Sequence, residues 1–129
     1  MTIRFRAFSD IDNMVNIRLL TSEDIPFVAE IEQLCFSEPW SENALAEELA
    51  NENSHFLVAV SDDVMGYIGV QEICGEAYIT NIAVFDKYRN LGIGRNLLNK
   101  AVEGALSRNC EFITLEVRES NETAISLYK

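Results

Sequence analysis

Apolar positions recur along the chain with two different periods, which predicts alternating strands and helices. The segment VNIRLL at 15–20 alternates apolar and polar residues and contains β-branched side chains, so we predict a first strand there. Helical spacing follows from Ile25 to Cys35, after a Thr21–Asp24 pair that resembles a capping box with Asp in place of Glu. The predicted elements therefore begin with a strand and a helix.

A second helix is predicted directly after a short break. Pro39 disfavours helical geometry at Glu38, so FSEPW at 36–40 should interrupt the helix. Ser41 can then cap a helix over ENALAEELAN at 42–51, in which Leu45 and Leu49 recur on neighbouring turns.

The rest of the chain reads as four strands and two helices. The strands are HFLVAV at 55–60, VMGYIGVQEI at 64–73, AYITNIAVF at 77–85 and CEFITLEV at 110–117, and the helices span about 93–105 and 121–128. The order βααβββαβα predicts a mixed α/β fold whose central sheet combines an antiparallel meander with one β–α–β crossover. We see no repeat or linker, so we expect one domain over 14–129, preceded by an N-terminal extension, residues 1–13, to which we assign no function.

Composition narrows the class of protein. The chain has 129 residues, of which 48% are hydrophobic, and this is enough for one real core. Its net charge of −11 argues against general affinity for nucleic acid or an anionic membrane and is compatible with a basic partner. No apolar run reaches the roughly 18 residues of a membrane span, and no signal peptide is visible.

The cysteines and the histidine carry no metal or nucleophile pattern. Cys35, Cys74 and Cys110 are far apart and lack ligand spacing, so we expect no metal site, three small core residues and a reducing, cytoplasmic setting. The lone His55 has no motif around it, and we expect a structural role.

The segment FDKYRNLGIGRN at 85–96 places two glycines before an amphipathic helix. A helix N-terminus presents unpaired N–H groups and a positive dipole, and glycine leaves them uncovered, so a phosphate can dock there. Arg89 and Arg95 flank the glycines and could add charge. The dinucleotide fingerprint fails because Leu97 stands where a third glycine is required, and no P-loop pattern is present. The alternative is a tight turn with no ligand.

The longer segment NIAVFDKYRNLGIGRNLL resembles the signature of the GCN5-related N-acetyltransferases (GNAT), with Arg89, Gly92 and Gly94 at the fixed positions of [Q/R]-x-x-G-x-[G/A]. The resemblance implies acetyl-CoA as cosubstrate: loop amides hold its pyrophosphate, the strand backbone pairs with the pantetheine arm, and the amide near Val84 polarises the thioester carbonyl. The implied cofactor-binding residues are Ile82, Ala83, Val84, Arg89, Asn90, Leu91, Gly92, Ile93, Gly94, Arg95 and Asn121.

A narrower resemblance lies downstream. LEVRESNETAISLY at 115–128, together with FSEPWS, is similar to the ribosomal-protein-alanine N-acetyltransferases. This implies direct transfer to the N-terminal alanine of a ribosomal protein, with Glu116 as base through water and Tyr128 as acid. Strand alternation turns Glu116 away from its apolar neighbours, and a tyrosine is protonated at neutral pH. Without the resemblance, Glu116 reads as a solvated strand residue, Tyr128 as a packed helix residue and Asn121 as a helix cap.

The resemblance also marks where this sequence departs from the family. The family continues through a further pair of strands, whereas this sequence ends at Lys129, so we expect a C-terminally shortened domain with an open edge at 110–117. That edge could pair with a second copy as a homodimer. The remaining alternatives are transfer to a small-molecule amine or a lysine, a coenzyme A-binding module without catalysis, and a purely structural domain.

Overall fold

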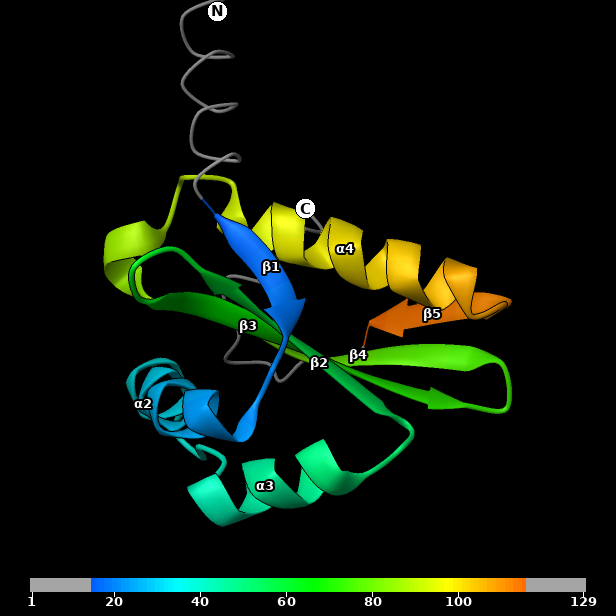
Figure 1. The fold of residues 1–129 in the computed structure, drawn as a ribbon, viewed down its shortest axis with the longest axis horizontal. Coiled ribbons are helices and arrows are strands. Elements are labelled where there is room, and N and C mark those ends of the chain that lie inside the picture. The colour runs from blue at the N-terminus through cyan, green and yellow to red at the C-terminus, as the bar shows by residue number, and fades with distance from the viewer. Residues whose placement is uncertain (1–14, 116–129) are drawn as a thin grey trace, which may run out of the picture.

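The computed structural model describes residues 15–115, which form one mixed sheet with helices on both faces (Figure 1). The described elements are β1 (Asn16–Leu19), α2 (Ile25–Cys35), α3 (Glu42–Ala50), β2 (Ser54–Val60), β3 (Val64–Ile73), β4 (Glu76–Val84), α4 (Ile93–Ser107) and β5 (Phe112–Leu115). Two short 3-10 turns, Ser22–Asp24 and Asp86–Tyr88, precede α2 and follow β4.

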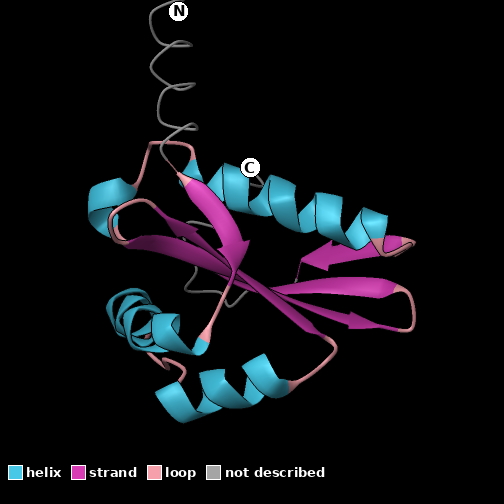
Figure 2. Cartoon of the chain, in the orientation of Figure 1, coloured by secondary structure: helices cyan, strands magenta, loops and turns pink. Residues whose placement is uncertain are grey.

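The sheet confirms the predicted topology. Its strand order is β1-β2-β3-β4-β5, with antiparallel pairing from β1 to β4 and parallel pairing between β4 and β5. The parallel pair requires a crossover, which α4 supplies. Figure 2 shows α4 on one side of the strands, with α2 and α3 on the other.

Two apolar layers hold the helices to the sheet. The layer under α4 contains Ile82 and Val84 of β4 together with Leu97 of the helix, all at most 2% exposed. The opposite layer, under α2 and α3, includes Tyr67 and Ala83. The first seven residues of β3 and the last four of β4 are buried without alternation, because both faces of the sheet are covered there.

The local signals in the first half of the chain are mostly confirmed. The hydroxyl of Ser41 accepts a hydrogen bond from Ala44 N–H at 3.1 Å and caps α3. The Thr21–Asp24 capping box is present, but it caps the N-terminus of the 3-10 turn Ser22–Asp24 and not that of α2 itself. Pro26 then occupies the first turn of α2, where its missing N–H costs no helical hydrogen bond.

The expectation that all three cysteines are core residues is wrong for Cys74. That residue is exposed in the turn between β3 and β4, where it adopts a φ of 52°. Tight hairpin turns need left-handed backbone, and this requirement prevailed over the apolar character of the side chain. Cys110 is buried as expected and Cys35 is half-buried.

The predicted extension at 1–13 and the last predicted helix lie outside the described residues. Within residues 15–115, no helix is long and apolar enough to cross a membrane.

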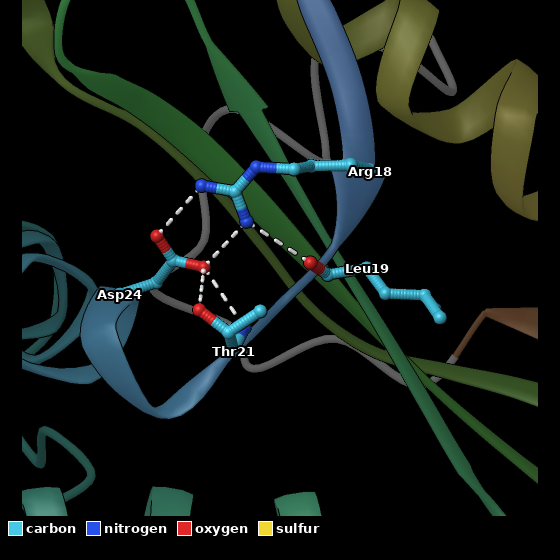
Figure 3. A network of polar contacts seen from close by, with 4 residues as sticks. All are labelled: Arg18, Leu19, Thr21 and Asp24. Carbon is cyan, nitrogen blue, oxygen red and sulfur yellow. Dashed lines mark hydrogen bonds and ion pairs between the residues drawn. The ribbon is translucent and has the colours of Figure 1, made fainter.

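An ion pair fastens β1 to the turn that starts α2 (Figure 3). Arg18 donates to both carboxylate oxygens of Asp24, at 2.7 and 3.0 Å. Asp24 also accepts from the N–H of Thr21 at 2.8 Å and from its hydroxyl at 3.0 Å. The Arg18 hydrogen bonds are the main reason that the pKa of Asp24 lies below its ordinary value of 3.8. The carboxylate is therefore stabilised in its charged form by folding.

This lowered pKa predicts a loss of stability in acid. The unfolded chain protonates Asp24 near its ordinary pKa of 3.8 while the folded chain resists protonation, so the contribution is complete above that pH and is lost as pH falls through the folded pKa. Asp24→Asn should remove this part of the pH dependence and cost about 1–3 kcal/mol at pH 7. Urea unfolding between pH 7 and 2 measures both effects. Glu47→Gln, on the exposed side of α3, is the control, and an Asp24→Asn protein with the original acid dependence would contradict the assignment.

Candidate functional site

The site begins where β4 ends and the chain turns into α4. Two residues of this turn adopt left-handed backbone: Asn90 with a φ of 66° and Gly92 with a φ of 82°. Glycine and asparagine are the residues that tolerate this region best. The residue types of the sequence therefore match the backbone that directs the chain into the helix.

The N-terminus of α4 is uncovered. Gly92 is the N-cap and has no side chain to bond the first turn, and the helical hydrogen bonding starts from Asn96 N–H to Gly92 O at 3.0 Å. Helix geometry leaves the N–H groups of Ile93, Gly94 and Arg95 without intrahelical acceptors. Together with the positive end of the helix dipole, these groups form a place for an anion.

Positive side chains are concentrated on the turn and along α4. Every Lys and Arg between Leu19 and Leu115 lies between Lys87 and Arg108, a range that covers the turn and α4. The segment from Thr21 to Asn53, which contains α2 and α3, has acidic residues and no Lys or Arg. The two sides of the sheet therefore differ in charge, and an anion is favoured on the α4 side.

The backbone of Val84, at the end of β4, points away from β3. Phe85 N–H donates to the carbonyl of Met65 at 3.0 Å, and the hydrogen-bonding edge alternates from residue to residue in an antiparallel pair. The N–H and C=O of Val84 therefore face the edge along which β5 pairs.

A bulge in β4 sets which side chains face α4. The register shifts where Gly69 pairs with Asn81 and Val70 pairs with Ile79, so Thr80 is the extra residue. Ile79 before the bulge and Ile82 after it consequently both join the α4 layer. Asn81 is 1% exposed and its Oδ1 accepts a hydrogen bond from the Thr80 hydroxyl at 2.6 Å.

Arg89 extends from the turn toward the protein rather than along α4. Its Nε donates to the carbonyl of Val84 at 3.2 Å, its Nη2 donates to the sulfur of Cys35 at 3.4 Å, and its Nη1 pairs with Asp86 at 2.7 Å. Burial raises the pKa of the Cys35 thiol, although Arg89 opposes this effect, so the thiol is neutral at pH 7. Arg95, by contrast, is exposed in the first turn of α4.

The layer opposite α4 contains a buried glutamate that no motif in the sequence marks. Glu32 is fully buried. Its Oε1 accepts the N–H of Trp40 at 2.9 Å, and its Oε2 accepts the hydroxyl of Tyr67. The signal in the sequence was its position seven residues after Ile25, on the apolar face of the helix. The hydrogen bond from Trp40 N–H to Glu32 fixes the connection between α2 and α3.

The structure brings most of the predicted cofactor residues together. Ile82, Ala83 and Val84 end β4, and 89–95 form the turn and the first residues of α4. Glu116, Asn121 and Tyr128 lie outside the described residues. Within residues 15–115, no group of three or more His, Cys, Asp or Glu side chains could hold a metal ion.

Comparison with known proteins finds matches to one family. The model of the acetyltransferase (GNAT) family matches residues 25–129. A putative ribosomal protein bS18-alanine N-acetyltransferase of Bacillus subtilis is 38% identical over 115 residues, which are 88% of this chain and 76% of that protein.

Solved structures show the same fold. The ribosomal-protein-S18-alanine N-acetyltransferase of Escherichia coli superposes with a TM-score of 0.78 at 33% identity, over 89% of this chain and 74% of that chain. A PaiA N-acetyltransferase of Thermoplasma acidophilum, solved with coenzyme A, has a TM-score of 0.77 at 23% identity, over 88% of this chain and 86% of that one.

The backbone of Gly92 gives a direct test of the turn geometry. Gly92→Val should lower the free energy of unfolding by about 1–2 kcal/mol, because a β-branched residue is strained at a φ of 82°. Gly92→Asn, with a side chain that tolerates this region, should lose less. Urea unfolding of the two variants measures the difference, and equal stabilities would show that the turn does not impose this backbone.

Proposed function

The chain belongs to the acetyltransferase (GNAT) family, and from that premise we propose that it acetylates the N-terminal alanine of a ribosomal protein. Membership of this family makes the chain an acetyl-CoA-dependent N-acetyltransferase. The identity of the acceptor is the part that we propose beyond the family's activity. It is supported by the names of the Bacillus subtilis and Escherichia coli relatives and by the similarity of LEVRESNETAISLY to this subfamily.

The observation that carries the cosubstrate part of the proposal is the bare first turn of α4. Acetyl-CoA contains a pyrophosphate, which needs hydrogen-bond donors and positive potential. The N–H groups of Ile93, Gly94 and Arg95 supply the donors, and the glycine N-cap leaves them open. The residues present therefore fit the nucleotide end of this cosubstrate.

The thioester end is assigned to the edge of β4. Val84 N–H points toward the β5 side of the sheet, where an extended pantetheine arm can pair with the strand backbone. A backbone N–H beside the thioester carbonyl stabilises the negative charge that develops on its oxygen during attack. Gly66 keeps this strand end close to β3, since a Cβ there would meet the carbonyl of Ala83 at 2.7 Å.

Glu116 and Tyr128 are the proposed base and acid. The acceptor nitrogen forms a bond to the acetyl carbon, and the carbon–sulfur bond breaks. A water relays one proton of the acceptor ammonium to Glu116 before the attack. Tyr128 protonates the departing thiolate, and the second proton, which the nitrogen loses as the amide forms, returns to Tyr128. Thr114 pairs with Tyr78 on the strand face opposite the α4 layer, and Glu116 itself lies outside the described residues.

The acceptor is tested by competition among three amines. The full chain is mixed with acetyl-CoA and a peptide that begins with free alanine, the same peptide with a blocked N-terminus and an internal lysine, and spermidine. We expect mass spectrometry to find acetyl only on the free alanine peptide. Acetylation of lysine or spermidine alone would overturn the acceptor assignment and leave the family intact, whereas binding of acetyl-CoA without any product would identify a binding module.

Substitutions separate the chemical step from binding in the same assay. Glu116→Gln should lower kcat by about 100-fold or more, because it removes the base, with little change in the Kd for coenzyme A. Glu111→Gln, at an exposed residue just before β5, is the matched control and should keep its kcat. Equal rates for Glu116→Gln and Glu111→Gln would show that Glu116 is not the base.

A homodimer through the sheet edge stays a prediction of the sequence. Its geometric basis is that β5 is the outer strand of the described sheet, next to β4. The extent of the domain, 14–129, is likewise our proposal.

A further inference from the structure

Arg89 has a different environment from the other arginine of the glycine turn. Each of its three nitrogens is directed at a group of the protein: the Val84 carbonyl, the Cys35 sulfur and the Asp86 carboxylate. Arg95 begins in the first turn of α4 and is exposed. Two arginines that flank the same glycines are therefore placed for different tasks.

The contact with Val84 controls the orientation of the strand end. The N–H and C=O of one residue in a strand point to the same edge. The carbonyl that Arg89 holds at 3.2 Å thus lies on the same edge as the Val84 N–H, to which we assign the thioester. A charged donor gives a stronger hydrogen bond than a neutral one and limits rotation of this residue.

The hydrogen bond from Arg89 to Cys35 also connects the turn to the apolar layer under α2 and α3. Cys35 is the last residue of α2, and the connection that follows is fixed by the Trp40 N–H bond to Glu32. One side chain therefore links the end of β4, the turn before α4 and the end of α2. This linkage joins the cofactor side of the fold to the α2–α3 side.

We infer that Arg89 is a positioning residue that fixes the Val84 backbone and the end of α2 for the thioester, and that it is not a ligand of the pyrophosphate. This inference rests on the proposed cofactor site. The anion is held by the backbone N–H groups at the start of α4, with Arg95 as the side chain that can add charge. Arg89 acts on the acyl end of the cosubstrate through Val84.

A positioning role and a pyrophosphate-binding role of Arg89 predict different effects on the affinity for a ligand without phosphates. We would measure the Kd of coenzyme A and of pantetheine, which lacks the pyrophosphate, by calorimetry on the full chain. Arg89→Lys keeps the charge but cannot make three separate contacts. It should raise both Kd values by a similar factor of about ten, a loss of about 1.4 kcal/mol. Arg95→Gln should weaken coenzyme A and leave pantetheine unchanged.

The opposite pattern would overturn the inference. If Arg89→Lys binds coenzyme A as the wild type does, or if its defect disappears with pantetheine, then Arg89 acts as a charge on the phosphates. Asp86→Ala, which removes one of the three partners at an exposed carboxylate, gives a milder variant should Arg89→Lys fold poorly. It should produce a smaller loss, again equal for the two ligands, and a loss confined to coenzyme A would refute the positioning role.

A kinetic comparison separates this result from failure of the proposed function. With acetyl-CoA and S-acetyl-pantetheine as donors to the alanine peptide, Arg89→Lys should reduce kcat/KM for both by the same factor. A wild-type chain that binds no coenzyme A would overturn the cofactor site and this role together. A wild-type chain that binds coenzyme A but acetylates no alanine peptide would overturn only the acceptor, and the calorimetric test would still decide the role of Arg89.

Discussion

The close pairing of β3 with β4 near Val84 is the constraint on which the rest of the site depends. A Cβ at Gly66 would lie 2.7 Å from the carbonyl of Ala83 and 3.0 Å from a methyl group of Val84, so only glycine allows this approach without a shift of one strand. The pairing fixes the end of β4. The turn, the N-terminus of α4 and the edge of Val84 all take their positions from that point.

In the proposed site the backbone contacts the cosubstrate, and the side chains hold that backbone in position. Backbone groups face the proposed cosubstrate, because N–H donors on a rigid strand and helix need no reorganisation when an anion or a developing oxyanion arrives. Side chains hold that backbone in place: Arg89 binds the carbonyl of Val84, and Leu97 of α4 packs in the same layer as Val84. This division explains why glycine and asparagine occupy the turn while the apolar residues lie beneath it.

The two faces of the sheet are covered by segments of opposite charge. The acidic segment 21–53 covers one face with α2 and α3, and the basic residues of 87–108 lie on the turn and α4. An anionic cosubstrate is favoured on the second side, and Arg89 is the side chain that reaches from there to Cys35 on the first. The buried Glu32 links the connection between α2 and α3 to β3, because it accepts hydrogen bonds from Trp40 N–H and from the hydroxyl of Tyr67.

The sequence by itself determined the order of the strands and helices, the meander with one crossover, the Ser41 cap and the glycine turn, because each depends on local periodicity or backbone preference. It also indicated the family, through a resemblance that the comparisons confirm, while the cofactor-binding residues that this resemblance implies stay a prediction. Only the tertiary structure decided the rest. Strict alternation would put Ile79 and Ile82 on opposite faces, and the bulge at Thr80 puts both under α4. The inward contacts of Arg89 and the buried partners of Glu32 join residues far apart in the chain, and no local pattern encodes which distant groups will meet.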